Sequence, residues 1–135
     1  FSCRQRASNL LLKGLIVSYI HTNKAKITCV NDPIDADATE WVFFSYQDWL
    51  RANESITAHA ATIAGGTIVT ASTLIGTVVD SLGVSYTNSY GVKFSVTAGA
   101  TQVEITHRIT STVTGTPDLG RANIDHTVIL KVKTL

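Results

Sequence analysis

The stretch Val103-Glu104-Ile105-Thr106-His107-Arg108-Ile109-Thr110 decides the fold class. Apolar side chains and one histidine recur at every second position, with polar or charged side chains between them. Successive side chains of a strand point to opposite faces of a sheet, so this period of two predicts a strand with one buried face. Such half-buried strands are typical of antiparallel sheets.

The same period recurs on both sides of this stretch. Residues 124–132 repeat it near the end of the chain. Gly65-Gly66 separates two earlier runs, at residues 56–63 and 67–73, and a short further strand is expected at residues 77–79. Asn31-Asp32-Pro33 reads as a stop, because proline cannot donate to a strand ladder. Seven or more short strands predict an all-β fold, which we interpret as an immunoglobulin-like antiparallel β-sandwich over residues 27–135. The core residues expected between its two sheets are Trp49, Phe94, Ile105, Ile109, Val128 and Leu130.

Residues 1–26 differ from the rest and hold the most apolar stretch of the chain. A sandwich of about 100 residues is already a complete domain without them. We therefore predict an N-terminal arm that docks on another chain, by strand addition at a sheet edge. The alternative is an extra strand on the domain's own sheet. The predicted partner interface consists of Leu10, Leu11, Leu12, Leu15, Ile16, Val17 and Ile20.

The composition favours a protein that is built into an assembly. Apolar residues make up 44% of the 135-residue chain, and charged residues only 16%, against about 25% in an ordinary soluble domain. Part of the surface is then expected to be covered by other subunits; the alternative is a threonine-rich surface that is polar but uncharged. A formal net charge of +1 without a basic stripe argues against nucleic-acid binding. No apolar run is long enough to predict a transmembrane helix.

No motif in the sequence indicates chemistry on a substrate. Gly-x-Ser-x-Gly, the P-loop, the dinucleotide fingerprint and His-Glu-x-x-His are all missing. We therefore expect no enzyme, no catalytic residue and no cofactor. The aromatic side chains of residues 41–49 could stack on sugars, but alternate residues of a strand face opposite ways, so we assign most of them to the core.

Metal binding is not expected either. His107 and His126 fall on the apolar faces of neighbouring strands, but a zinc site needs three or four ligands. We expect Cys3 and Cys29 to be free thiols, with a bond that fixes the N-terminal segment as the alternative. We predict a solvated loop rather than a calcium site for the acidic residues Asp32, Asp35, Asp37 and Glu40.

Several segments follow one another in a distinctive order. Asn31-Asp32-Pro33 precedes Ser45-Tyr46-Gln47-Asp48-Trp49-Leu50, and Asn53-Glu54-Ser55-Ile56-Thr57 comes next. Later come residues 94–99, the alternating stretch 103–110, and Gly120-Arg121 before the final strand. Across residues 31–133 this series resembles the phage fibre–tail adaptor family of small virion proteins. The chain departs from that family at Ser45, His107 and Val103, where the family has Asp, Asn and Tyr.

The resemblance implies a bacteriophage virion structural protein, located in the tail, that joins tail or portal components to fibres. Its partners are then other virion proteins and copies of itself, held by multivalent protein–protein contacts in a homo-oligomer. Trp49, Gly120 and Arg121 match the family's motifs and would have structural roles: an apolar surface, a tight turn and a planar fork for carbonyl groups. Two alternatives stay open, namely a capsid decoration or cement protein and a glycan-binding module for host recognition.

Overall fold

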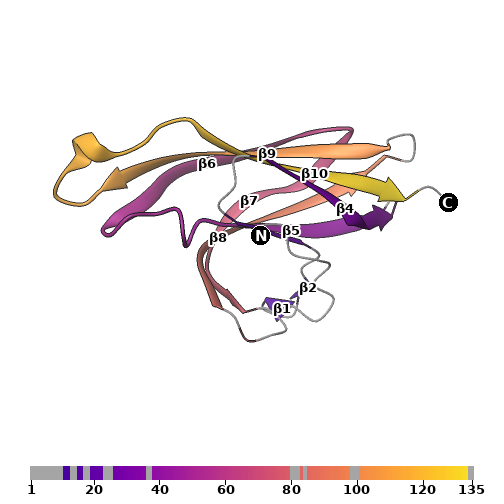
Figure 1. Cartoon of the computed structure of the whole chain (residues 1–135), viewed down its shortest axis with the longest axis horizontal. Coiled ribbons are helices and arrows are strands. Elements are labelled where there is room, and N and C mark those ends of the chain that lie inside the picture. The colour runs from indigo at the N-terminus through magenta and orange to yellow at the C-terminus, as the bar shows by residue number, and fades with distance from the viewer. Residues whose placement is uncertain are drawn as a thin grey trace.

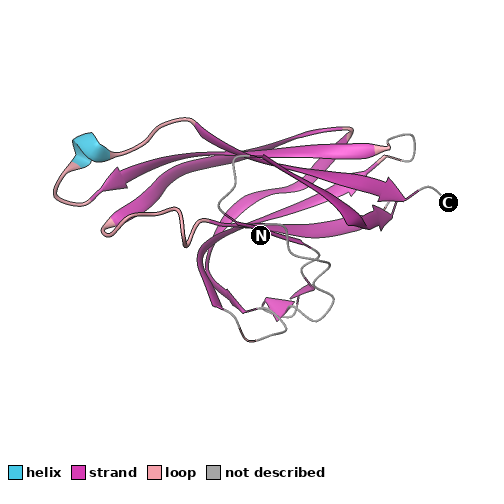
Figure 2. Cartoon of the chain, in the orientation of Figure 1, coloured by secondary structure: helices cyan, strands magenta, loops and turns pink. Residues whose placement is uncertain are grey.

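The computed structural model describes residues 11–12, 15–16, 19–22, 26–35, 38–79, 83, 85–97 and 101–133. These residues form strands and a single 3₁₀ turn, η1, at Pro117–Leu119 (Figure 2). The strands are β1 (Leu11–Leu12), β2 (Leu15–Ile16), β3 (Tyr19–Thr22), β4 (Lys26–Asp35), β5 (Thr39–Ser45), β6 (Glu54–Ala64), β7 (Gly66–Val79), β8 (Ser85–Val96), β9 (Gln102–Val113) and β10 (Ile124–Lys133).

The strands make two sheets that lie face to face (Figure 1). One sheet has the order β4-β10-β9-β6, and the other has the order β2-β1-β7-β8-β5-β3. Most neighbours are antiparallel, but β4 runs parallel to β10 and β3 runs parallel to β5. The all-β prediction is confirmed, in the form of a two-sheet, mainly antiparallel sandwich.

The alternating stretch is the centre of the four-stranded sheet. β9 pairs with β10 on one side and with β6 on the other. In this register Ile105 lies opposite Val128, and His107 lies opposite His126. Both alternating strands therefore direct their apolar faces to the same side, which is the face toward the second sheet.

The core lies between the sheets and contains most of the residues predicted for it. Five of the six are fully buried, namely Phe94, Ile105, Ile109, Val128 and Leu130. The prediction for Trp49 is wrong: it follows β5 in the turn at residues 47–49 and packs against the core while only partly buried. A second, smaller cluster of Phe43, Val78 and Tyr86 is also buried. Phe43 is out of phase with Val42 and Phe44 of the main core, so this cluster lies on the opposite face of the six-stranded sheet.

Two strand boundaries differ from the sequence-based expectation. β4 continues through Pro33 to Asp35, because it is an edge strand and an edge tolerates a residue without an N–H. Its ladder with β10 is irregular near this point. The two runs expected at residues 67–73 and 77–79 form the single strand β7, which keeps its pairing to β8 through irregularities on either side of Thr70.

The turn predicted at Gly65-Gly66 is confirmed and carries the chain from one sheet to the other. Gly65 has φ +84°, and a Cβ there would lie 2.5 Å from the carbonyl oxygen of Gln102. Only glycine combines that backbone conformation with that close approach. As a result β6 and β7 are consecutive in sequence but belong to different sheets.

Candidate interaction surface

The described residues of the predicted N-terminal interface lie in short strands. Leu11 and Leu12 form β1, Leu15 and Ile16 form β2, and Ile20 lies in β3; Leu10 and Val17 are outside the described residues. β1 pairs with the end of β7, and β3 pairs with β5, so these strands belong to the six-stranded sheet. That these residues contact a second chain remains a prediction.

The two histidines predicted on apolar faces meet in the core. His107 and His126 are both buried. His107 Nδ1 is 2.7 Å from the hydroxyl of Tyr46, in a buried hydrogen bond. Burial lowers the pKa of His126 to about 4, so its ring is neutral at pH 7. Both histidines are therefore core residues as expected, and the hydrogen bond is observed at His107, while His126 packs against the rings of Tyr46 and Trp49.

A third histidine joins this group from β6. The ring centroid of His59 is 5.9 Å from that of His107, and His59 Nδ1 is 2.6 Å from Ser72 Oγ on β7. Burial lowers the pKa of His59 as well. Within the described ranges, no group of three or more His, Cys, Asp or Glu side chains is placed to hold a metal ion. The three rings therefore act as packed aromatic groups that connect the two sheets.

The acidic residues do not form the single loop that the sequence predicted. Asp32 and Asp35 lie in β4, and Glu40 is buried in β5, while Asp37 is outside the described residues. The prediction failed because it took Pro33 as the end of a strand. The residues Cys3 and Cys29 also remain untested, since Cys3 is outside the described residues.

The aromatic side chains of residues 41–49 are either buried or have a cation over one ring face. Phe43, Phe44 and Tyr46 are buried. The Arg121 guanidinium lies 3.3 Å from the ring centroid of Trp49, and the Lys93 ammonium lies 5.3 Å from that of Trp41. Cations thus occupy a face of each tryptophan ring.

Arg121 is the centre of a largely buried ionic cluster. It donates to both carboxylate oxygens of Glu54 and to the carbonyl oxygen of Trp49. Arg51 and Ser111 also donate to Glu54, whose side chain is completely buried. Burial raises the pKa of the Glu54 carboxyl, but these hydrogen bonds outweigh burial and hold that pKa well below its ordinary value. The cluster fastens the chain after β5 to the start of β6 and to the loop before β10.

The backbone around this cluster is close-packed. A Cβ at Gly120 would overlap the carbonyl oxygen of Ser111. The backbone N–H of Ser111 donates to the carbonyl oxygen of Arg121 at 2.7 Å. The predicted roles of Gly120 in a tight turn and of Arg121 in holding carbonyl groups therefore have a physical basis in the structure. Both roles are structural.

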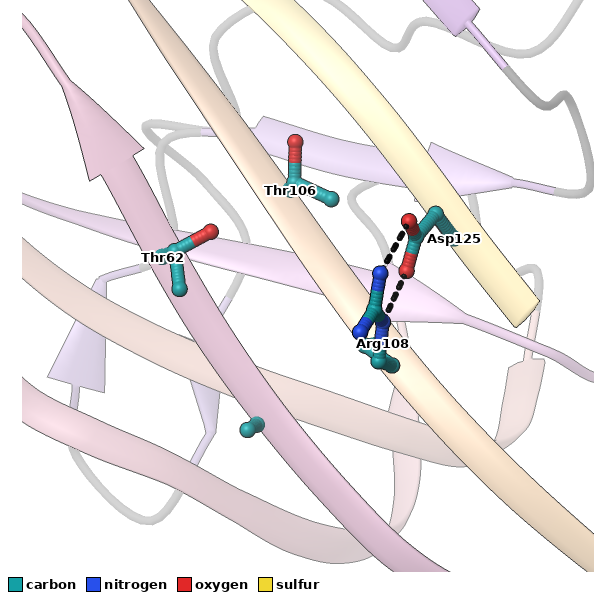
Figure 3. A pocket seen from close by; sticks show the side chains of 5 residues that line it. Thr62, Thr106, Arg108 and Asp125 are labelled. Atoms are coloured by element: carbon teal, nitrogen blue, oxygen red, sulfur yellow. Dashed lines mark hydrogen bonds and ion pairs between the residues drawn. The ribbon is translucent and has the colours of Figure 1, made fainter. Parts of the chain in front are cut away.

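A shallow groove of about 310 Å³ lies on the outer face of the four-stranded sheet. Figure 3 shows its lining side chains, among which Arg108 and Asp125 form a two-bonded ion pair at 2.7 and 2.9 Å. The hydrogen bonds from Arg108 hold the pKa of Asp125 below its usual value. The other lining residues are small: Ala60 and Thr62 of β6, and Thr106 of β9. With its charges already paired, the groove has no free charged group to bind a small ionic ligand.

The most unusual surface is formed by β6 and β7. Residues 55–79 contain no Asp, Glu, Lys or Arg, and most of them are exposed or only partly buried. Among the described residues, the exposed large hydrophobic side chains are Val69, Leu74, Val79 and Leu119, of which the first three lie on β7. The sequence signal for this surface is the run of 25 residues without Asp, Glu, Lys or Arg, which matches no motif.

Two further findings concern the chain as a whole. Within the described ranges, no helix has the length and apolar character needed to cross a membrane. No protein-family description, curated protein or solved structure matches the chain.

Proposed function

We propose that the chain is a structural protein of a bacteriophage virion, a tail adaptor that joins tail or portal components to fibres. It acts by multivalent contacts with other virion proteins and with copies of itself. The observation that carries this proposal is the uncharged surface of β6 and β7. A free monomer normally keeps charge on its surface to remain apart from its copies, and residues 55–79, which form this surface, have no Asp, Glu, Lys or Arg.

We further propose that the sandwich is of the immunoglobulin type. In that fold one sheet has the strand order A-B-E-D and the other has the order C-F-G. The order β5-β8-β7 corresponds to B-E-D of the first sheet, and the order β6-β9-β10 corresponds to the second. β3 takes the place of strand A, but it comes from residues 1–26 and runs parallel to β5. β4 is then an additional strand beside the last one, and β1 and β2 extend the other sheet beyond β7.

The segments that carry the family resemblance support the proposal because they meet in one place. Trp49, Glu54 and Arg121 come from three separate segments, and hydrogen bonds join them in the ionic cluster. The two late segments of the resemblance, in β9 and β10, pair with each other along their length. A motif whose members contact one another forms a structural unit, as a rigid adaptor module requires.

The test is the position and number of this chain in purified particles. We expect quantitative mass spectrometry to find it in intact virions at tens of copies or fewer, and in isolated tails after the capsids have been removed. Hundreds of copies that stay with the capsid would favour the decoration protein instead. Absence from the particles would refute both assignments.

The glycan-binding alternative has its own measurement. Titration of the isolated domain against host surface polysaccharide should give no saturable binding, because the tryptophan rings are already covered by Arg121 and Lys93. Saturable binding that is lost on Trp41→Ala would make the host-recognition module the better assignment.

A further inference from the structure

We propose that two copies of this chain pair edge to edge through β6, so that one continuous sheet runs through both. This inference rests on the proposed function only in that the chain assembles with copies of itself. It names the surface by which they meet. The argument starts from the edges of the two sheets.

Among the strands that the structure describes, four lie at sheet edges, and three of these carry features that disfavour pairing with another chain. β4 contains Lys26, Asp32 and Pro33, and charged residues and proline are the usual protections of an edge. β2 and β3 are two and four residues long, too short to serve as a long template. β6 is eleven residues long, has no proline, and has Glu54 as its only charged residue. That side chain is buried in the ionic cluster, so it does not protect the edge.

β6 is also regular where an added strand would need it to be. Residues 58–64 pair one for one with β9, and the only irregularity of this ladder lies between Ile56 and Ala58. At about 3.4 Å per residue the regular part is about 24 Å long. Within the described part of the chain, β6 pairs with no other strand, so its outer backbone groups are open to a partner. β7 pairs with β1 only at Val79, and its own course is interrupted by register shifts against β8 near Thr70.

A second copy fits this edge better than a charged partner does. Antiparallel pairing about a two-fold axis at Ala61 uses the whole regular part and sets Ala60 opposite Thr62 of the other copy. No charged side chain then faces its own counterpart, and the outer-face residues are all small: Ala58, Ala60, Thr62 and Ala64. A partner with a charged edge would find no opposite charge in β6. The neutral, self-compatible edge therefore favours a copy of itself.

The pairing also covers groups that the single chain leaves partly exposed. On the inner face Ile63 would lie opposite His59 of the other copy, and both are partly exposed in the single chain. On the outer face Ala60 and Thr62 form one wall of the groove in Figure 3. The grooves of the two copies would join across the axis and leave the Arg108–Asp125 pairs on its two outer sides.

Charge reversal across the axis gives a sharp test. In one variant both Ala60 and Thr62 are replaced by Lys, and in the other both are replaced by Asp. In the proposed register each homodimer sets like charges directly opposite each other, whereas the mixed dimer sets opposite charges there. Sedimentation equilibrium at low salt should show that the wild type is a dimer. Each variant alone should have a dimer dissociation constant about tenfold or more above that of the wild type. An equimolar mixture of the two variants should restore the dimer.

The controls separate loss of pairing from loss of folding. Ala60 lies opposite Arg108 within the same sheet, so the urea midpoint of each variant is measured first. Recovery of the dimer in the mixture shows in addition that both chains are folded. Thr67→Lys serves as a matched control, because Thr67 is exposed in the same uncharged run but lies on β7. It should dimerise like the wild type.

The inference would be overturned by a monomeric wild type across the micromolar range, by variants that dimerise normally, or by a mixture that stays monomeric. A loss of association in Thr67→Lys alone would place the interface on β7 and would overturn it as well. A monomeric wild type would leave the virion assignment standing. Absence of the chain from virions would refute that assignment without affecting a dimer measured in solution.

Discussion

Replacing Arg121 by alanine tests the ionic cluster that joins the most distant segments of the sandwich. The change removes two hydrogen bonds to Glu54, at 2.9 and 2.5 Å, and one to the carbonyl of Trp49, at 3.0 Å. It also uncovers the ring of Trp49. The Glu54 carboxylate would stay buried with only Arg51 as its cationic partner.

The expected cost follows from burial. Breaking a buried ion pair by removing one partner costs about 3–5 kcal/mol. Arg51 stays and still donates to Glu54, so the ionic part belongs at the low end, about 3 kcal/mol. The lost cation–π contact adds about 0.5–1 kcal/mol. We therefore expect Arg121→Ala to lower the free energy of unfolding by about 3.5–4 kcal/mol at pH 7.

Urea unfolding followed by tryptophan fluorescence measures this change. Arg51→Ala is the matched control, because its side chain is 48% exposed and an exposed ion pair is worth about 1 kcal/mol or less. The difference between wild type and Arg121→Ala should also depend on pH. Glu54 has a lowered pKa in the folded state, so its contribution is complete above its ordinary pKa and is lost as the pH falls below that value.

The result that would refute this reasoning is clear. A loss below about 1 kcal/mol, equal to that of the exposed Arg51 control, would show that the cluster has the energy of a surface ion pair. A difference between wild type and variant that stays constant from pH 7 to acid would show that the Glu54 carboxylate is not the group that Arg121 stabilises.

Three further predictions concern other parts of the sandwich. Because the pKa of His126 is lowered to about 4 by burial, stability should fall by about 3 kcal/mol between pH 6.5 and pH 4, and acid titration of His126→Gln should show a smaller loss. Gly65→Ala should lower the free energy of unfolding by more than about 2 kcal/mol, because the positive φ and the close carbonyl of Gln102 both oppose a Cβ at this position. Gly115 also has a positive φ but lies in open space, so Gly115→Ala should cost about 1 kcal/mol. Thermal unfolding of the two variants measures the difference. Deletion of residues 1–26 should leave cooperative unfolding and abolish incorporation into particles if they contact another chain; an unfolded product would show that β1–β3 are required for the fold.

The sequence predicted best where one strand face meets the core and the other meets solvent. β9 and β10 satisfy this condition, and their buried residues were identified correctly because the alternation records it directly. Proline lacks an N–H, so Pro33 predicts the end of β4. An edge strand tolerates proline, but the local sequence does not show that β4 lies at an edge, because this depends on the order of the whole sheet. The sequence predicts a break in β7 at residues 74–76, because Leu74 and Ile75 are both apolar and Gly76 follows them, but their pairing with β8 is in register.

The candidate interaction surface required information that local patterns do not contain. Arg121 and Glu54 are 67 positions apart, so no local window could pair them. The large apolar side chain of Trp49 predicts a position in the core. In the structure Trp49 lies outside the two sheets, and the Arg121 guanidinium packs on one face of its ring. The free edge of β6 follows only from the strand order, although the uncharged run that forms it is visible in the sequence.

The arrangement of β10 has a mechanical consequence. This strand is held between β4, which runs parallel to it, and β9, which runs antiparallel to it. A pull along β10 would load both ladders in shear, so that many hydrogen bonds must yield together rather than one after another. A strand peeled from an edge would instead lose its bonds singly under a much smaller force. The last strand of the domain is thus placed where tension along the chain is best resisted.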